Sequence, residues 1–388
     1  MIEIQDIFSQ YGADYLLGHA LSPVQLKAFR DILHCRTETL GSHADVCDVC
    51  GHQEISYNSC RNRHCPKCQT IAKEQWIDKQ RQSLLDVPYF HVVFTLPDAL
   101  NPIVYQNQDI MYDLLFKTAA GTLLELSDDP KYLGATPGAT AVLHTWGQNL
   151  LYHPHLHFIV TGGGLSPSHE WVNSREKFFV PVKVLSSKFR GKFMAYFRAA
   201  NLSFYNDVAD LGNPAAFSSF VSALYAKDWV TYCKPPFGGP SKVISYLGRY
   251  THRVAISNNR ILHCDDGLVK FNWRDYKDSN KVKEMTIASE EFIRRFMLHI
   301  LPSGFRKIRH YGILAARDKS KRIILCRSLM YPNDCLNSLG APRSVLQILK
   351  DTFGADFNIC PRCGKGHLFS ASSKTVELSA FTSVDKNS

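Results

Sequence analysis

The stretch His153-Pro-His-Leu-His-Phe-Ile-Val160 carries the strongest fold signal in the sequence. Side chains alternate between the two faces of a β-strand, so a strand here would place the histidines on one face and the apolar residues on the other. One face receives His153, His155 and His157, and the other receives Leu156, Phe158 and Val160. This pattern indicates a strand that packs on a core with one face and presents metal ligands on the other.

Strands and helices are expected on both sides of this stretch, without a regular strand–helix–strand repeat. A second buried strand is predicted at 90–96, where a β-branched and aromatic run ends at Pro97. The histidine strand itself is expected to end at Gly162. Helices are expected at 110–126, 188–201 and 289–300, and two further strands within 254–273. We therefore predict an α+β fold in which helices flank an antiparallel sheet.

The composition describes a folded, basic chain. Its 388 residues are 45% hydrophobic, which excludes bulk disorder and suffices for two or three domains. Lys and Arg outnumber Asp and Glu by 45 to 35, and the net charge of +10 favours a polyanionic partner. No apolar run approaches the roughly 20 residues of a membrane helix. Without a signal-peptide pattern, a cytoplasmic protein that does not contact membranes is expected.

Twelve cysteines in such a chain indicate metal ligands rather than disulfides. The pairs Cys47-Asp-Val-Cys50 and Cys65-Pro-Lys-Cys68 are separated by 14 residues, a spacing that predicts one structural zinc site. Cys60 and His64 are further plausible ligands, and His43 and His52 weaker ones. A second ion, or an alternative set of four, stays open.

Cys360-Pro-Arg-Cys363 near the C-terminus is half of another zinc site. Three alternative pairs could supply its two missing ligands: Cys60 with His64, Cys326 with Cys335, or His367 with another group. The remaining cysteines are expected to be plain core residues: Cys35, Cys233 and Cys264.

Two imidazoles one strand-step apart suit a divalent metal, so His155 and His157 are predicted metal ligands. Gln148 could provide an amide oxygen as a third ligand, although an ordinary surface role fits it equally well. Such a set suits Mn²⁺ better than Mg²⁺, and either ion would polarise a phosphate.

Tyr246 and Tyr250 stand four residues apart in a predicted helix and are therefore neighbours on its surface. A phenol is a weak nucleophile at neutral pH and needs cations that stabilise the phenolate. The helix places three of them around Tyr246: Lys242, Arg249 and Arg253. With a metal on the histidine strand, this arrangement points to attack on a phosphodiester.

The sequence resembles the HUH transposases of insertion sequences, in particular the two-tyrosine insertion-sequence-ninety-one family with its zinc-binding N-terminal domain. The resemblance covers nearly the whole chain. Its motifs are YNSCRNRHCPKC (57–68), FHVVFTLP (90–97), HPHLH (153–157), YLGRYTHR (246–253), and FIRR (292–295) with GFRKIRHYG (304–312). It implies a five-stranded antiparallel sheet with His155 and His157 on a central strand as metal ligands, and Tyr246 and Tyr250 as nucleophiles. Gln148 only loosely matches the third-ligand position of related replication initiators.

The resemblance implies a DNA endonuclease and strand transferase. A tyrosine attacks a phosphate at one end of the element, forms a 5′-phosphotyrosine and frees a 3′-hydroxyl that primes replication. The implied partners are single-stranded DNA at the element ends and target DNA, with homo-oligomers and host replication proteins left open. The implied location is the bacterial cytoplasm, with nucleoid association through DNA. The alternatives are a rolling-circle replication initiator of a plasmid or phage, and a non-enzymatic zinc DNA-binding protein.

Three domains are expected: a helical, zinc-binding domain (1–84), the HUH domain with the tyrosine helix (85–287), and a basic C-terminal segment with the CxxC pair and a disordered tail (288–388). Between positions 294 and 327 ten Lys or Arg face one acid, Asp318. Aromatic residues lie among these cations, as on a surface that holds single strands. The predicted DNA contacts here are Arg294, Arg295, Arg306, Lys307 and Arg309, in addition to Lys242, Arg249 and Arg253 around Tyr246.

Overall fold

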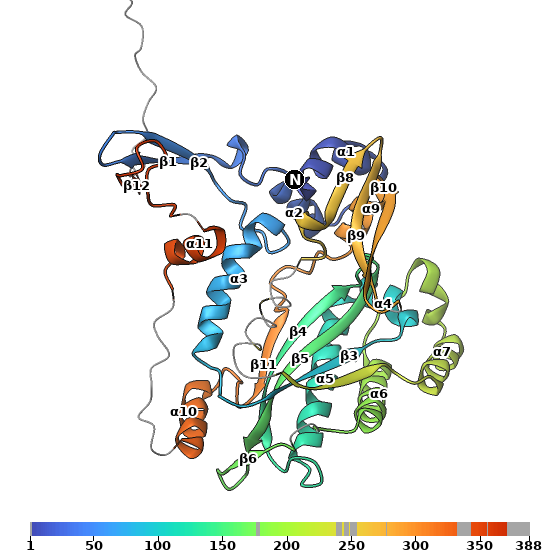
Figure 1. Cartoon of the computed structure of the whole chain (residues 1–388). Coiled ribbons are helices and arrows are strands. Elements are labelled where there is room, and N and C mark those ends of the chain that lie inside the picture. The colour runs from blue at the N-terminus through green and yellow to red at the C-terminus, as the bar shows by residue number, and fades with distance from the viewer. Residues whose placement is uncertain are drawn as a thin grey trace, which may run out of the picture.

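The computed structural model describes residues 2–175, 179–237, 254–276, 278–331, 343–354 and 356–370, together with Val243 and Gly248. Its centre is an antiparallel sheet in the strand order β11, β4, β5, β3, β7, with the short β6 paired to β5 (Figure 1). The strands are β3 (Tyr89–Thr95), β4 (Thr136–Trp146), β5 (Tyr152–Leu165), β6 (Trp171–Asn173), β7 (Thr231–Phe237) and β11 (Ile308–Gly312). The predicted α+β class is confirmed, and β5, which carries the histidine stretch, is the central strand.

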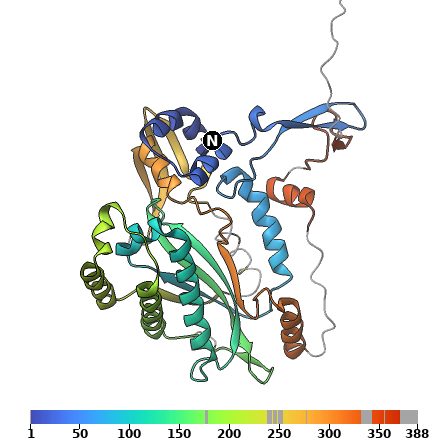
Figure 2. The same cartoon turned by 180° about the vertical axis from the view of Figure 1, so that it is seen from behind.

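A layer of helices covers the apolar face of this sheet, as the teal and green helices of Figure 2 show. The helices are α4 (Asn101–Gln106), α5 (Gln108–Asp128), α6 (Val182–Ala199) and α7 (Pro214–Ala226). Leu156, Phe158 and Val160 of β5 are fully buried against this layer. Burial of such side chains stabilises the fold by about 1.5–3 kcal/mol each. The apolar half of the alternation therefore fixes the side of the sheet on which the histidines lie.

The central strand is longer than expected because its glycines continue it instead of ending it. A Cβ on Gly162 would lie 2.7 Å from the Pro88 carbonyl oxygen, and one on Gly164 would lie 2.7 Å from Thr136. Glycine thus allows β5 to pass close to neighbouring backbone. The prediction that the strand stops at Gly162 is wrong for this reason.

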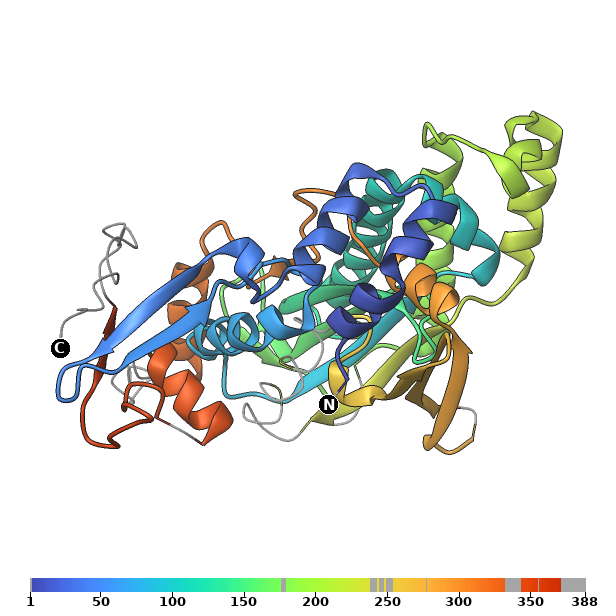
Figure 3. The ribbon, with the colours of Figure 1, turned by 90° about the horizontal axis from the view of Figure 1, so that it is seen from above.

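A second antiparallel sheet, in the order β10, β9, β8, packs on the two N-terminal helices and on the helix that directly follows β10. Its elements are β8 (Ile261–Asp265), β9 (Leu268–Asp275), β10 (Lys281–Ala288), α1 (Ile4–Gly18), α2 (Pro23–Leu33) and α9 (Ser289–Met297). Figure 3 shows the dark blue N-terminal helices beside the orange and gold elements of this sheet. Their shared core includes Phe8, Phe29, Phe271 and Phe292. The domain boundaries expected near residues 84 and 287 stay predictions.

A third sheet joins the two ends of the chain. The C-terminal β12 (Leu368–Ser370) pairs with β1 (Ser42–Cys47), which pairs with β2 (Gln53–Tyr57). Near it lie α3 (Pro66–Arg81) and α11 (Val345–Phe353), which pack on each other, whereas α10 (Lys319–Met330) lies near β6 at the far end of the main sheet (Figure 1).

Arg343, just before α11, ties the C-terminal part to α3. Its guanidinium donates to Asp78 at 2.9 Å and to Glu74 at 3.1 Å, both on α3, and to Asp351 at 2.8 Å. Asp78 is buried, so this ionic cluster is partly shielded from solvent and holds α11 against α3.

Short 3-10 helices complete the described elements: Glu38–Leu40, Asp98–Leu100, Asn206–Gly212 and Asn258–Arg260. Within the described residues, every helix is too short or too polar to cross a membrane.

Candidate metal centres

Three imidazoles from two paired strands form one group on the sheet face opposite the α5–α6 layer. His155 and His157 lie on β5, and His144 lies on β4, where it is paired directly with His155. Ring nitrogens of the three lie within 4.8 Å of one another. We call His144, His155 and His157 the histidine cluster. Residues that pair directly across an antiparallel sheet point to the same face, so the register of β4 on β5 brings His144 to the predicted pair.

Hydrogen bonds orient the imidazoles of the histidine cluster. The Nδ1–H of His155 donates to the carbonyl of His153 at 2.7 Å, which fixes the orientation of the ring. His157 shares a 2.8 Å hydrogen bond between its Nδ1 and Nε2 of His91, a β3 residue on the same face. Burial, with Lys234 and His155 nearby, lowers the pKa of His91 to about 3, so His91 is neutral. The ring of Trp146 stacks on His144 at 4.8 Å.

The two other residues suggested for this site make different contacts. Gln148 lies in the turn between β4 and β5, and its side-chain amide donates to the hydroxyl of Tyr276 at 2.8 Å. His153 contacts the carboxylate of Asp98 at 3.2 Å and is outside the group of three. His144, which sequence reasoning missed, occupies the place expected for a third ligand. A regular hairpin register drawn from the pair Trp146 and Tyr152 would have missed it, because a register shift between His144 and Trp146 brings His144 opposite His155.

Tyr246 and Tyr250, with Lys242, Arg249 and Arg253, lie outside the described residues. We call residues 242–253 the tyrosine segment. Two of its residues are described. Val243 is fully buried in a cluster that includes Ile159, on the same face of β5 as His157. A Cβ on Gly248 would lie 2.4 Å from Cδ1 of Ile77, so the backbone there runs directly against α3. The segment is thus anchored at these two points to the histidine face of the sheet and to α3.

Eight cysteines form two groups of four. The N-terminal sulfur cluster joins Cys35, Cys60, Cys65 and Cys68, with Sγ–Sγ distances of 3.5–3.6 Å. The shared sulfur cluster joins Cys47, Cys50, Cys360 and Cys363, with distances of 3.7 and 3.8 Å. Four sulfurs about 2.3 Å from a central zinc lie about 3.8 Å apart, so both donor sets fit a tetrahedral, closed zinc site.

The predicted grouping of the N-terminal cysteines is wrong. The pair Cys47 and Cys50 does not join Cys65 and Cys68, because β12 adds to β1 and brings the C-terminal pair to it. Cys35, expected in the core, is fully buried but lies in the N-terminal sulfur cluster. The half-site at Cys360 and Cys363 is completed by Cys47 and Cys50, which were not among its expected partners.

The other candidates for zinc lie outside both clusters in the described residues. His64 accepts from the Leu301 amide through Nε2, His43 contacts Asn58, and His52 contacts Glu54. Four further residues are not in either group: Cys233, Cys264, Cys326 and His367. Cys335 is outside the described residues.

Several cations of the basic segment make contacts within the chain. Arg294 and Arg295 both donate to Glu291, each at 2.6 Å, and these hydrogen bonds lower the carboxyl pKa of Glu291 to about 2. Arg309 pairs with Asp113. Arg306 is exposed, whereas Lys307 lines a cavity. The predicted DNA contacts of these residues stay predictions.

Comparison with known proteins gives consistent matches. A family model described as "Putative transposase" matches residues 138–322, and one described as "Transposase zinc-binding domain" matches residues 7–96. The chain is 45% identical to "Putative transposase y4qJ" of Sinorhizobium fredii, over 97% of this chain and 95% of that protein. It is 29% identical to "Transposase for insertion sequence element IS801" of Pseudomonas savastanoi pv. phaseolicola, over 80% and 75%. No solved structure matches the chain.

The two sulfur clusters predict two zinc ions per chain. Cys35→Ser and Cys360→Ser each remove a ligand from a different cluster, so each variant should retain one ion. Cys233→Ser, whose thiol lies outside both clusters, is the matched control and should retain two. Elemental analysis of protein purified without chelators measures this. A single ion in the wild type, or two in Cys35→Ser, would contradict the assignment.

Proposed function

This chain belongs to the insertion-sequence-ninety-one family of transposases. On that premise we propose that it cleaves and rejoins single-stranded DNA at insertion-sequence ends through 5′-phosphotyrosine intermediates, in rolling-circle transposition. The observation that carries the proposal is the histidine cluster, because three imidazoles that converge from the paired strands β4 and β5 could hold a metal ion, and Val243 of the tyrosine segment is buried on the same face of the sheet. Single-stranded DNA at the ends and target DNA are the proposed partners.

The residues proposed to hold the catalytic metal, Mg²⁺ or Mn²⁺, are His144, His155 and His157. Three nitrogen ligands suit Mn²⁺ better than Mg²⁺, which prefers oxygen and water. When bound, such an ion supplies Lewis-acid polarisation of a phosphate oxygen. The chain contributes the orientation of the rings: the carbonyl of His153 holds His155, and His91 holds His157.

Tyr246 and Tyr250 are the proposed nucleophiles. The phenol oxygen forms a bond to phosphorus, the bond from phosphorus to the 3′ oxygen breaks, and that oxygen leaves as a 3′-hydroxyl after taking a proton. The phosphodiester energy is kept in the phosphotyrosine, so no ATP is needed. A later attack by a 3′-hydroxyl reverses the step and joins the strands. The burial of Val243 on the histidine face and the approach of Gly248 to α3 support the proposal, because these two residues come from the same stretch of chain as the tyrosines.

A rolling-circle initiator would use the same residues for a different purpose, and a non-enzymatic zinc protein would leave the histidine cluster without a role. Family membership supports the transposase over both alternatives.

Incubation of the chain with single-stranded end DNA and Mn²⁺ or Mg²⁺ should give a covalent adduct on a denaturing gel. Tyr246→Phe should abolish the first cleavage more completely than Tyr250→Phe, because Lys242, Arg249 and Arg253 flank Tyr246 on the predicted helix.

Equal losses in the two variants would contradict this ranking of the tyrosines. A wild-type chain that forms no adduct with either metal and several end sequences would contradict the enzymatic proposal itself.

A second pair of variants separates the two candidates for the third metal ligand. His144→Ala should lower the cleavage rate more than about 100-fold while single-strand binding persists, because it removes an imidazole from the cluster. Gln148→Ala should cleave at nearly the wild-type rate, since its amide contacts Tyr276. The double variant His155→Ala with His157→Ala should bind without cleaving. A large loss of cleavage in Gln148→Ala with nearly wild-type cleavage in His144→Ala would identify Gln148 as the third metal ligand.

A further inference from the structure

The edge strand β7 continues the alternation of the main sheet and brings a tyrosine and a lysine to the face of the histidine cluster. The hydroxyl of Thr231 donates to a backbone carbonyl at the start of α6, and Cys233 packs on the core between the sheet and the helices. Both side chains thus point to the helix layer. Since side chains alternate along a strand, Tyr232 and Lys234 point to the other face.

The strand register places Tyr232 and Lys234 in line with the histidines. Val93 of β3 pairs with His157 of β5 and with Tyr232 of β7. His91, on the same face of β3, pairs with Lys234. Directly paired residues share a face, and neighbouring strands lie about 4.8 Å apart, so Tyr232 lies about 10 Å from His157 across the sheet. The histidine cluster and these two residues are therefore parts of one surface.

Tyr232 and Lys234 present an accessible ring and an accessible cation. Tyr232 is 41% exposed, and His91 meets its ring edge-on at 6.3 Å. Lys234 is exposed, and its ammonium lies 5.2 Å from the centroid of the Tyr232 ring. None of the ion pairs among the described residues includes Lys234. The ring and the cation are thus close enough to contact a base and a phosphate of the same strand.

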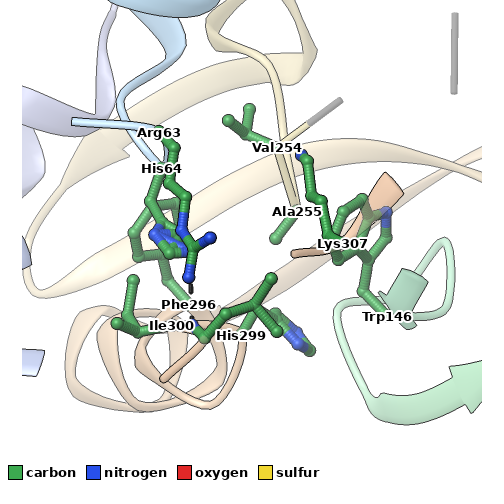
Figure 4. Close-up of a pocket in the computed structure, with 10 residues that line it drawn as sticks. Arg63, His64, Trp146, Val254, Ala255, Phe296, His299, Ile300 and Lys307 are labelled. Atoms are coloured by element: carbon green, nitrogen blue, oxygen red, sulfur yellow. Dashed lines mark hydrogen bonds between the residues drawn. The ribbon is translucent and has the colours of Figure 1, made fainter. Parts of the chain in front are cut away.

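The other phenol and indole rings described at this face are enclosed. Tyr89 is 2% exposed, and its hydroxyl contacts backbone groups of Leu85. Trp146 is 8% exposed; it stacks on His144 and also lines a small cavity (Figure 4). Within the part of the face that the structure describes, Tyr232 is therefore the ring on which a base could stack.

The charge of this surface suits a polyanion. The strands β3, β4, β5 and β7 contain no Asp or Glu, so no carboxylate of these strands neutralises Lys234 or repels a phosphate. Proteins that hold single strands combine cations along the backbone with aromatic rings on which bases stack. Tyr232 and Lys234 provide one of each. A peptide that added to the edge of β7 would use backbone groups instead and would need neither side chain.

We propose that Tyr232 and Lys234 form a nucleotide-binding subsite, in which a base of the DNA strand stacks on the ring of Tyr232 and a backbone phosphate contacts Lys234. The path of the strand rests on the proposed function, because that function places the phosphate to be cleaved at the histidine cluster. Since the subsite lies about 10 Å from His157, the stacked base belongs to a nucleotide near the cleaved phosphate. Every base has a π-face, so the subsite positions the strand without reading its sequence.

The first measurement is the affinity of the zinc-loaded chain for a labelled single-stranded end oligonucleotide without added Mg²⁺ or Mn²⁺. Tyr232→Leu should bind about tenfold more weakly because it removes the ring, and Tyr232→Phe should bind as the wild type does. Tyr225→Leu is the matched control, since Tyr225 is 45% exposed on α7 in the opposite layer, and its affinity should not change. Wild-type affinity in Tyr232→Leu, or an equal loss in Tyr232→Phe, would overturn the proposal.

Lys234→Met tests the phosphate contact. The slope of log affinity against log salt should become shallower by about 0.7, as expected for one lost phosphate contact to a single strand. Lys227→Met, which changes an exposed lysine beyond α7, should keep the wild-type slope. An unchanged slope in Lys234→Met would contradict the contact between Lys234 and a phosphate.

A crosslinking measurement detects the stacked base directly in the wild-type chain, so it does not depend on how a variant folds. Iododeoxyuridine replaces each position of the end oligonucleotide in turn, and light joins it to an aromatic side chain that it contacts. Mass spectrometry should find Tyr232 attached to a position near the cleaved phosphate. A Tyr232 that only supports the ring of His91 would give no adduct. Adducts at other residues alone, or a dimer that Tyr232→Leu dissociates, would overturn the proposal.

His155→Ala with His157→Ala separates this inference from the proposed function. That variant should lose cleavage but keep the adduct at Tyr232 and the wild-type salt slope. Absence of cleavage in the wild type with the adduct and the affinity loss present would reject the proposed chemistry and retain the subsite. Cleavage in the wild type with neither effect would reject the subsite and retain the chemistry.

Discussion

The antiparallel register of β4 on β5 is the constraint on which the candidate site depends. Because His144 pairs with His155, two imidazoles from different strands face the same side, and His157 follows one strand-step on. A slip of one residue would turn His144 into the apolar layer, where Leu143 and Leu156 now pack. The register is held by that layer, since it buries Leu156, Phe158 and Val160 on the opposite face. The alternation of apolar and histidine side chains along β5 thus determines both the packing of the core and the geometry of the candidate site.

The two sulfur clusters hold together the part of the chain around the small third sheet. This sheet and its loops are too small to be held by hydrophobic burial alone. The N-terminal sulfur cluster fixes the start of α3, because Cys65 and Cys68 stand at its first turn. The shared sulfur cluster then ties the end of the chain to β1. Arg343 adds an ionic contact to α3 at Asp78. Ile77 of α3 in turn contacts Gly248.

The sequence predicts features that depend on a periodic pattern or on short spacings. It misses contacts that depend on how strands pair with each other. The alternation in 153–160 was enough to predict a strand, its core face and the shared face of His155 and His157, whereas the central place of this strand in the sheet was implied only by the family resemblance. His144 was missed because its place follows from register across a turn, not from a spacing. Cys35 was assigned to the core because nothing near it repeats the CxxC pattern. The partnership of Cys47 with Cys363 spans 316 residues and follows from the pairing of β12 with β1.

Pulsed EPR of the zinc-loaded chain with one equivalent of Mn²⁺ tests the central claim most directly, because it reports the nitrogen ligands without requiring activity. The account predicts one bound Mn²⁺ with ¹⁴N couplings from three imidazoles in the wild type. His144→Ala should lose one of these couplings, whereas Gln148→Ala should leave the spectrum unchanged. A Mn²⁺ without nitrogen couplings, or a His144→Ala spectrum identical to that of the wild type, would contradict the account.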